Sequence, residues 1–454
     1  MQLLKQDVLV LGAGPSGIAA ADFAVRQGLE VLMLEGGVRE IYPVDAWGKP
    51  DDLYPIKAGG IGGQSNVWGA QVVFPEEKLI KHLSRILETD EVWIKELRNH
   101  VEDLCIQMNL PIDSSNCYFN DETFFNDKFQ TKYSIYLQDT NLSNYFHDSL
   151  SNVEIQQDVH VLSLRFDADR VVTVSTSKGS WVVPQDKILI IALGTIETTL
   201  LLKRSNLPGA EMIGGGLHDH PSGYLFSFAG QHMKGIRRNP TRKFKNHVLK
   251  RKFEYTSERH SRSAIIEFHY ILRDENEHGI FPIRIELQNL IKFYINAFSL
   301  RLLGFLPLDV QKIRVWLQIE QEQIEANQIA VIHGGPEITW KLSDTDKDLI
   351  YEVYEVLRQH LHSIGIFPTN EFDDWESIFS SFRPALHPSG TIPVVKRASE
   401  TGLTNFYGVL NCFPNVGIAS GALLPCTSWY NPTLLIMAMA RNTCKYLIRS
   451  KISE

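Results

Sequence analysis

The sequence has few cysteines, no long uncharged apolar run and no excess of positive charge. Five cysteines among 454 residues, with no C-x-x-C pair and no Cys/His zinc spacing, exclude a disulfide scaffold, favour a reducing compartment and predict no metal site. No window reaches about 18 uncharged apolar residues, so we expect no transmembrane helix. The opening MQLLKQDVLVLGAG leads directly into a strand and a glycine turn, and we therefore expect no secretory signal and a cytoplasmic location.

The balance of charge limits the classes of partner. The chain has 45 basic and 53 acidic residues, for a formal net charge of −8, which argues against general nucleic-acid binding. Hydrophobic residues make up 44% and charged residues 22%, an ordinary composition for a globular protein. The length is about three times a typical domain of roughly 150 residues, which predicts two large or three small units.

One region departs from the acidic balance. Residues 234–252 contain nine lysines and arginines, and residues 290–306 (LIKFYINAFSLRLLGFL) carry only Lys292 and Arg301 as charges. A basic cluster near an amphipathic helix is typical of contact with a membrane surface, so peripheral membrane association remains open. The alternatives are a solvated hairpin for the basic residues and a core helix for 290–306.

Hydrophobic periodicity predicts the elements of secondary structure. Residues 7–75 have an α/β pattern, with strands at 8–11 and 31–34, a helix at 16–27 and then a glycine-rich loop. Residues 153–205 alternate like strands and end in the apolar run KILIIALG. We expect further helices at 91–108, 344–364 and 432–448.

A dinucleotide fingerprint follows the first strand. Gly12-Ala13-Gly14-Pro15-Ser16-Gly17 is a GxGxxG sequence that opens a helix. Gly12 permits the tight turn, Gly14 lets a pyrophosphate approach the backbone, and Gly17 lets the helix lie close to the strand. The negative charge of the ligand would then lie at the helix N-terminus.

The second strand ends in Glu35, 23 positions after Gly12, where a carboxylate can accept hydrogen bonds from ribose hydroxyls. The same carboxylate would repel a 2′-phosphate, so NADP is disfavoured. This fingerprint by itself leaves FAD and NAD open.

A second glycine-rich loop, Gly59-Gly60-Ile61-Gly62-Gly63-Gln64-Ser65-Asn66-Val67-Trp68-Gly69, has five glycines in eleven residues. Backbone of this kind can press against a flat ring system. The loop resembles the flavin-contacting loop of the glucose–methanol–choline (GMC) oxidoreductases. Its Gly-Gly-x-Ser-x-x-Trp-Gly form is most similar to the sugar-oxidising and polysaccharide-cluster branches of that family.

Later segments resemble further motifs of the same family, in the same order. They are residues 190–197, residues 214–221 (GGGLHDHP), Glu320-Gln321 with residues 327–331, residues 387–391 (HPSGT), and residues 431–434 (NPTL). Two positions depart from the family pattern: Gln328 stands where Arg is usual, and Ser420 stands where an acidic residue is usual.

The resemblance implies which residues contact a bound FAD. The first histidine, His82, and the first cysteine, Cys105, both lie beyond the flavin loop, so we expect noncovalent FAD. The residues expected to contact it are Gly12, Gly14, Pro15, Ser16, Gly17, Glu35, Gly36, Gly60, Gly63, Ser65, Asn66, Trp68, Gly69, Val161, Ala192, Gly194, Ala419, Ser420, Asn431, Pro432 and Thr433.

The resemblance also implies the catalytic residues. His387 would accept the hydroxyl proton, because imidazole titrates near working pH, and Asn431 would hold the hydroxyl toward it. The pH profile should then show one main imidazole-like ionisation. The alternatives are a loop histidine for His387 and a helix N-cap for Asn431. Asp219 and His220 are expected to be structural or to contact the flavin, and Trp68 either stacks on a substrate ring or fills the core.

We therefore predict an α/β Rossmann-like FAD-binding domain, formed by residues 1–75, 150–225 and 385–454. An α+β substrate domain with an antiparallel sheet would comprise residues 76–149 and 226–384. The expected function is oxidation of an alcohol, favoured to be a sugar or a sugar-containing hydroxyl, by hydride transfer to flavin N5, with oxygen or another carrier as electron acceptor. Three alternatives remain: a flavin-containing lyase, an NAD-dependent dehydrogenase, and a non-catalytic flavoprotein subunit at a membrane surface.

Overall fold

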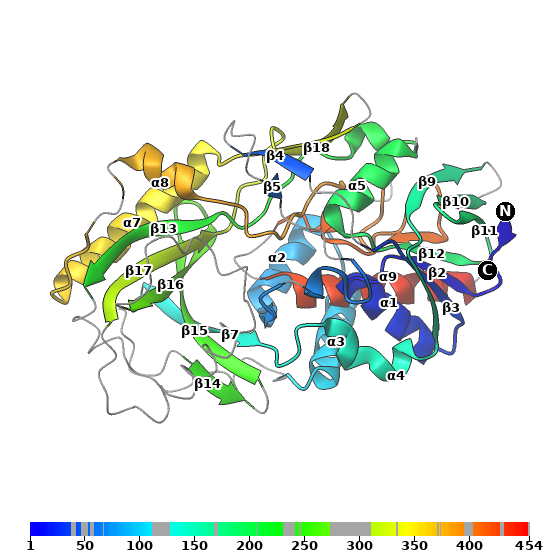
Figure 1. Ribbon diagram of the computed structural model, residues 1–454, viewed down its shortest axis with the longest axis horizontal. Coiled ribbons are helices and arrows are strands. Elements are labelled where there is room, and N and C mark those ends of the chain that lie inside the picture. Colours follow the sequence, from blue (N-terminus) through cyan, green and yellow to red (C-terminus); the bar gives the residue numbers. More distant parts are fainter. Residues whose placement is uncertain are drawn as a thin grey trace.

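The structure is a computed structural model of the chain. It describes residues 1–37, 42–46, 53–54, 59–66, 68–110, 128–167, 171–205, 207–229, 241–244, 247–272, 310–332, 335–369, 372, 374–394, 403–426 and 431–452. The molecule is elongated, with both termini near one end and helices α7 (Asp344–Ser363) and α8 (Trp375–Ser381) at the other (Figure 1).

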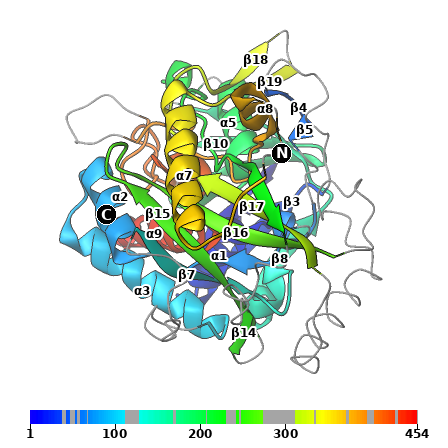
Figure 2. The ribbon, with the colours of Figure 1, turned by 90° about the vertical axis from the view of Figure 1, so that its left-hand side faces the viewer.

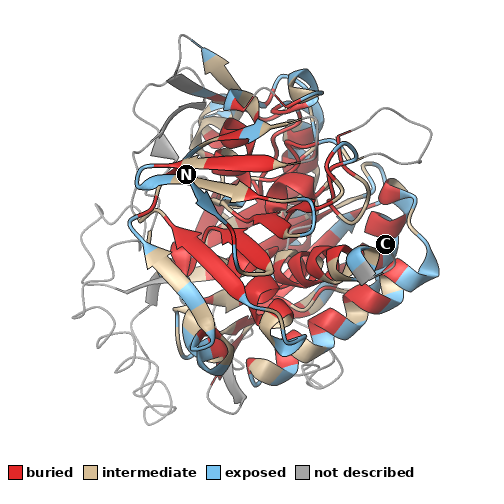
Figure 3. Ribbon diagram, turned by 90° about the vertical axis from the view of Figure 1, so that its right-hand side faces the viewer, coloured by how far each residue is buried: buried red, intermediate tan, exposed pale blue. Residues whose placement is uncertain are grey.

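A five-stranded parallel sheet forms the centre of the unit that contains both termini. Its strands, in spatial order, are β20 (Val416–Ile418), β12 (Ile188–Ile191), β2 (Val8–Leu11), β3 (Val31–Glu35) and β8 (Val153–Gln157). Three of them, β2, β3 and β12, are buried at every residue and are apolar throughout except for Glu35 at the end of β3 (Figure 3). Such runs are typical of parallel strands that are covered on both faces.

Alternate residues of these strands enter two different cores. Val8 and Val10 pack into the core that contains residues of α1 (Pro15–Arg26) and α9 (Thr433–Ile452). Leu9 and Leu11 pack on the opposite face, into a core shared with a four-stranded sheet. That sheet has the order β1 (Gln2–Leu3), β11 (Gly179–Val183), β10 (Val172–Thr176) and β9 (Val161–Phe166).

The second large sheet is antiparallel. Its strands are β13 (Ser222–Ala229), β17 (Val310–Ile319), β16 (Arg262–Leu272), β15 (His247–Ser257), β7 (Phe129–Tyr136) and β6 (Gln71–Val72), and β14 (Thr241–Phe244) pairs with β15. Residues of α7 and α8 pack on one face of this sheet in a separate apolar core. Figure 2 shows α7 on the near side of the sheet and the parallel-sheet unit beyond it.

The remaining elements connect these sheets. A small sheet has the order β18 (Gln328–Ile332), β19 (Gly335–Trp340), β4 (Tyr42–Ala46) and β5 (Leu53–Tyr54). The other α-helices are α2 (Glu77–Leu87), α3 (Glu91–Gln107), α4 (His147–Leu150) and α5 (Gly194–Arg204). Short 3-10 turns are η1 (Gly63–Asn66), η3 (Leu142–Phe146), η4 (Ala210–Met212) and η6 (Gly421–Leu423).

Local capping explains where the long helices begin. Asp90 accepts a hydrogen bond from the backbone of Trp93 at 2.8 Å, which fixes the start of α3. Ser343 and Asp346 form a capping box at the start of α7. The predicted helices at 16–27, 91–108 and 344–364 are confirmed to within one residue at either end. Helix α9 begins one residue later and ends four residues later than predicted, at Ile452.

The parallel sheet, with its glycine turn, and the antiparallel sheet both agree with the predicted fold class. The domain boundaries stay a prediction. Strand β6 lies within 1–75 yet pairs with β7 of the antiparallel sheet. Helix α3 lies within 76–149 yet packs against α9.

The basic stretch is described only in part, and residues 290–306 lie outside the described residues. Lys250 and Lys252 both pair with Glu267 at 2.5 Å, and Lys252 is 2% exposed. Lys252 therefore fits neither the solvated nor the membrane-surface alternative, whereas β14 and β15 pair in an antiparallel arrangement, as expected for a hairpin. Among the described residues, no helix is long and apolar enough to span a membrane.

A buried charge network joins three helices of the unit that contains the parallel sheet. Arg441 of α9 is fully buried and binds Asp22 of α1, Asp103 of α3 at 2.5 Å, and Gln107. Asp22 is also fully buried and accepts a hydrogen bond from Ser149 at 2.6 Å. Removing one partner of such a pair leaves the other charge buried without compensation.

We therefore predict that Arg441→Met lowers the free energy of unfolding by about 3–5 kcal/mol, because Asp22 keeps its burial and loses its hydrogen-bonded cation, while Arg26 stays at 3.7 Å. Urea denaturation measures the change. Arg165→Met is the matched control, because Arg165 is 66% exposed and pairs only with Asp167 among the described residues; it should change stability by less than about 1 kcal/mol. Equal effects of the two substitutions would contradict a stabilising role for the network.

Candidate active site

Most of the predicted cofactor residues follow the carboxyl ends of adjacent parallel strands. Gly12 follows β2, Glu35 ends β3, Ala192 follows β12 and Ala419 follows β20. In open parallel sheets, ligands bind outside this edge. The fold therefore brings together residues that are separated by up to about 400 positions in the chain.

The first glycine turn has the geometry that the fingerprint requires. Gly12 has a φ of +100°, and a Cβ atom there would lie 2.6 Å from the carbonyl oxygen of Ala192. A Cβ at Gly17 would lie 2.0 Å from the carbonyl oxygen of Gly12. A Cβ at Gly14 would meet nothing within 4 Å, so the backbone is open there at the N-terminus of α1. The first turn of α1 contains no acidic residue, which favours an anion at this end.

The second glycine loop packs directly on the first. The backbone amide of Gly62 donates to the carbonyl oxygen of Ala13 at 2.9 Å, and a Cβ at Gly63 would lie 2.8 Å from the Cα of Gly14. Glu35 links the two loops, because its carboxylate accepts hydrogen bonds from the backbone of Ala13 at 2.8 Å and of Gly60 at 3.2 Å. The two glycine-rich segments thus form one continuous backbone surface.

His387 and Asn431 are in direct contact. The side-chain amide of Asn431 donates to Nε2 of His387 at 2.9 Å, although the two residues are 44 positions apart. Asn431 Oδ1 also accepts a hydrogen bond from the backbone of Thr433 at 3.0 Å, so it caps the start of α9 as well. The capping interaction fixes the amide and leaves its NH₂ group directed at the imidazole.

Asp219 holds the backbone of the loop that presents His387. Its carboxylate accepts hydrogen bonds from the amides of His220 at 2.6 Å, Ala385 at 3.2 Å and His387 at 2.9 Å. Asp219 is fully buried, and the ring of His220 lies edge-on to the ring of His387, with 5.3 Å between centroids. Asp219 is therefore a positioning residue for His387.

Gln321 and Asn327, from the segments 320–321 and 327–331, bind the backbone around Asp219 and Lys341. Gln321 accepts hydrogen bonds from the backbone of Asp219 at 2.9 Å and from the indole of Trp340 at 2.8 Å. Asn327 exchanges two hydrogen bonds with the backbone of Lys341, at 2.8 and 3.0 Å. Both side chains therefore fix the positions of backbone segments. Gln328, the position that departs from the family, forms a bridge with Gly215.

The segment after His387 is hydrogen-bonded to the start of α5 and to η6. Thr195, near the start of α5, donates to the carbonyl oxygen of Pro388 at 2.6 Å. The backbone amides of Gly390 and Ile392 donate to the carbonyl oxygens of Gly421 and Ala422, at 3.2 and 2.9 Å. These contacts place the HPSGT segment at the carboxyl edge of the parallel sheet.

The environment of His387 disfavours its protonated form. Burial, and secondarily the positive charge of Lys252, lowers the pKa of His387 to about 4. Nδ1 of His387 has no hydrogen-bond partner among the described residues. The imidazole is thus neutral at ordinary pH, and its ionisation lies below the value near 6.5 that an unperturbed ring would show.

Several predicted contacts have structural partners. The Trp68 indole donates to the carbonyl oxygen of Thr140 at 2.6 Å and packs against the main core, which favours the core-filling alternative. Ser65 bonds the carbonyl oxygen of Gly62, and Asn66 bonds those of Gly59 and Ile61. Val161 packs into the core beneath the four-stranded sheet, and Ser420 caps η6 through the amide of Ala422.

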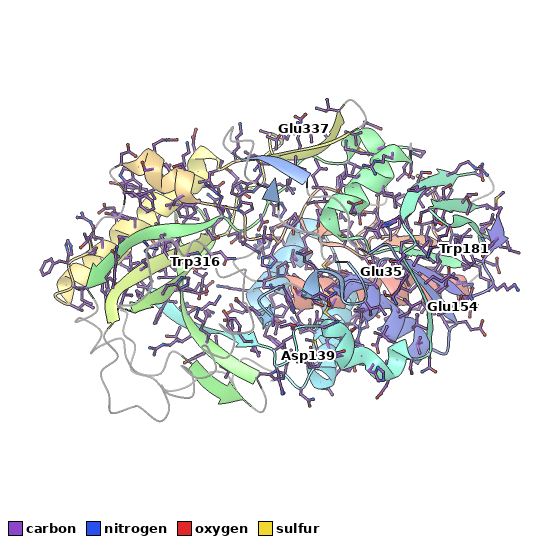
Figure 4. The ribbon with its side chains drawn as sticks, in the orientation of Figure 1. Glu35, Asp139, Glu154, Trp181, Trp316 and Glu337 are labelled. Atoms are coloured by element: carbon purple, nitrogen blue, oxygen red, sulfur yellow. The ribbon has the colours of Figure 1, made fainter. Side chains whose placement is uncertain are left out.

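Three further predicted positions are glycines: Gly36, Gly69 and Gly194. A Cβ at Gly36 would lie 2.8 Å from Nδ1 of His160, and one at Gly69 would meet nothing within 4 Å. Gly194 begins α5 with a φ of +76°. Figure 4 labels Glu35 within the parallel-sheet unit and Trp316 on the antiparallel sheet. Neither the amides bound by Asp219 nor the position of Lys252 could be predicted from the sequence, because both depend on long-range packing.

Solved structures share this fold. Pyridoxine 4-oxidase from Mesorbium loti aligns with a TM-score of 0.61 over 98% of this chain and 99% of that chain, at 12% identity. A variant of formate oxidase from Aspergillus oryzae RIB40, studied for modification of its FAD, aligns with a TM-score of 0.61 over 99% and 98%, at 15% identity. Another formate oxidase structure gives 0.57 at 14% identity, over 99% and 98%. No family model and no curated protein matches the chain. At these identities the likeness shows the fold alone.

We predict that Asp219→Asn lowers the free energy of unfolding by about 1–3 kcal/mol, because an amide NH₂ would replace an oxygen that now accepts backbone hydrogen bonds. Chemical denaturation measures the change, and NMR of the histidine rings should show a shifted His387 signal. Asp374→Asn is the matched control: Asp374 accepts the amide of Ser377 at 2.7 Å at an exposed N-cap, where Asn serves equally well. An unchanged His387 signal in Asp219→Asn would contradict the positioning role.

Proposed function

We propose that the protein is an FAD-dependent oxidoreductase of the GMC type that oxidises an alcohol to a carbonyl. The observation that carries the proposal is the contact of His387 with Asn431, at the sheet edge where both glycine-rich loops meet. The shared fold with two named oxidases supports it.

The residues present fit a dinucleotide with a flat ring system. The open backbone at Gly14 and the acid-free N-terminus of α1 suit a pyrophosphate. Glu35 retains acceptor capacity for ribose hydroxyls beyond its backbone hydrogen bonds. We propose that FAD is bound noncovalently, because the contact residues from 59 to 69 contain neither His nor Cys and Cys105 is fully buried in α3.

Bound FAD would supply the hydride acceptor, and the chain would supply a base and an orienting group. The 2.9 Å contact between Asn431 Nδ2 and His387 Nε2 marks where a substrate hydroxyl fits. Such a hydroxyl would replace the contact by accepting from the Asn431 amide and donating to Nε2. Neutral His387 then takes the hydroxyl proton as the carbon loses its hydride, while Asp219 and the Thr433 cap keep both groups in place.

We further propose a sugar or sugar-containing alcohol as the substrate. The family resemblance of the second glycine loop favours this class. On the antiparallel sheet, Lys252 and Glu267 form a buried ion pair. Polar groups on this side of the site suit hydroxyl-rich substrates and disfavour long apolar alcohols.

The alternatives differ in simple observations. A lyase would hold FAD without reduction by alcohols, and an NAD-dependent dehydrogenase would be purified without flavin colour. The decisive test is anaerobic mixing of the purified protein with sugars, polyols, sterols and simple alcohols, followed by flavin absorbance. Bleaching by at least one alcohol supports the proposal. Colourless protein that takes up no added FAD, or flavin that no alcohol reduces, would overturn it.

We predict that His387→Ala slows flavin reduction by at least about a hundredfold while FAD stays bound, because it removes the base and leaves the glycine loops intact. Stopped-flow absorbance measures the rate, and the flavin-to-protein ratio measures binding. His362→Ala on α7 is the control, because His362 is exposed and should leave both values unchanged. Wild-type rates in His387→Ala would remove His387 from this role.

The lowered pKa of His387 predicts an unusual pH profile. The neutral, proton-accepting form is populated above the pKa of about 4, so flavin reduction should rise as pH increases through that value and stay level from about pH 6 to pH 9. Single-turnover rates across this range give the profile. A half-maximal rate near pH 6.5 would instead indicate an imidazole with its ordinary pKa.

A further inference from the structure

The face of the antiparallel sheet away from the α7 core carries a row of polar and aromatic residues. Tyr224 pairs with Trp316, Trp316 with Glu267, and Lys252 with Lys132 on neighbouring strands. Lys252 Nζ lies 2.5 Å from Glu267 Oε1, which joins the two halves of the row. Directly opposed residues of an antiparallel sheet share a face, so all five lie on one side.

This face is directed at the parallel-sheet unit. Trp316, and Ile265 two residues before Glu267, pack against the core that contains α1 and α9. Figure 2 shows the sheet between α7 and that unit. Lys252 is 2% and Glu267 5% exposed, so this part of the sheet carries buried charge.

His387 lies on the same side of the sheet. The ring of His220 contacts that of His387, and the carbonyl oxygen of Pro221 accepts from the backbone of Ile319 at 3.0 Å, so strand pairing reaches residue 221. His220 and Tyr224 are four residues apart and therefore share a face, about 13 Å from each other along an extended strand.

About 13 Å along the strand from His220, whose ring contacts that of His387, four half-buried side chains form one cluster. The hydroxyl of Tyr224 lies 2.9 Å from Nδ1 of His269, and the rings of His269 and Trp316 are stacked at 5.8 Å with a 17° interplanar angle. The guanidinium of Arg314 lies 5.3 Å from the centroid of the Tyr224 ring. The cluster combines flat aromatic faces with hydroxyl, imidazole and guanidinium groups at their edges.

This combination matches the chemistry of a sugar ring, which has C–H faces that pack on aromatic rings and hydroxyls that bond to polar edges. The buried Lys252–Glu267 pair lies beside the cluster, and an alkyl chain laid over it would add no polar contact to those charges. The spacing of about 13 Å between His220, next to His387, and Tyr224 of the cluster exceeds the length of one sugar ring.

We propose that Tyr224, His269, Trp316 and Arg314 form a distal subsite for a sugar ring other than the one that is oxidised. The substrate is then an oligosaccharide or a glycoside with two or more rings. This inference rests on the proposed alcohol oxidation, whose reacting hydroxyl it places at His387. The distal ring is recognised before and after the reaction alike, so it contributes to binding more than to the chemical step.

The test compares sugars of increasing length on the FAD-loaded protein. Isothermal titration calorimetry under anaerobic conditions measures the Kd of one-, two- and three-ring members of a gluco series and a manno series. Stopped-flow flavin reduction is recorded with the same sugars. We expect at least a tenfold lower Kd for two or three rings than for one ring in at least one series.

Trp316→Leu keeps apolar volume and removes the flat ring, so it should reduce that preference to about one. Trp181→Leu is the control, because Trp181 lies on the four-stranded sheet at the opposite end of the molecule (Figure 4). It should retain the full preference. Arg314→Met, which removes the guanidinium from the Tyr224 ring, should also weaken the preference and replaces Trp316→Leu if that variant does not fold.

The outcomes separate this inference from the proposed function. Equal affinity for one, two and three rings in both series, absence of binding by the longer sugars, or a preference that survives in Trp316→Leu would overturn the distal subsite. Length-dependent binding without flavin reduction would support the subsite and overturn the oxidation. Flavin reduction that is fastest with one-ring alcohols, with no length preference in Kd, would support the oxidation and overturn the subsite.

Discussion

One buried carboxylate holds the candidate active site together. Asp219 accepts backbone hydrogen bonds from His220, Ala385 and His387, and so joins two segments that are more than 160 residues apart. Because backbone amides are fixed in direction, the carboxylate determines the course of both segments and not merely their proximity. The hydrogen bond between His387 and Asn431 depends on that course, since a small shift of the loop would separate the imidazole from an amide fixed by the α9 cap.

The electrostatics of the site follow from its position between two units. The carboxyl edge of the parallel sheet provides free backbone at Gly14 and the N-terminus of α1, which suits an anion. The antiparallel sheet contributes the buried charge of Lys252, held by Glu267, whose own pKa is kept well below its ordinary value by Lys250 and Lys252 although burial opposes this. His387 lies between these two environments, and its lowered pKa favours the neutral imidazole.

The fold is shared with solved oxidases at only 12–15% identity. Some positions are fixed by geometry: at Gly12, Gly17 and Gly214 a Cβ would strike a backbone oxygen, and at Gly63 it would strike the Cα of Gly14. Most other positions need only be apolar on the correct face, as in β2 and β12, and many side chains satisfy that condition. A short set of glycines, carboxylates and capping residues can therefore persist while the rest of the chain changes.

The sequence by itself determined the local features of this protein. Apolar runs predicted β2, β3 and β12, and hydrophobic periodicity predicted α1, α3 and α7, because these features depend on neighbours a few positions away. The family resemblance singled out His387 and Asn431 but not their hydrogen bond, nor the backbone amides gathered by Asp219. The buried pairing of Lys252 with Glu267 ran against the expectation that a basic stretch is solvated. Only the tertiary structure decided these, because each joins groups on different elements whose distance is set by the packing of whole sheets and helices.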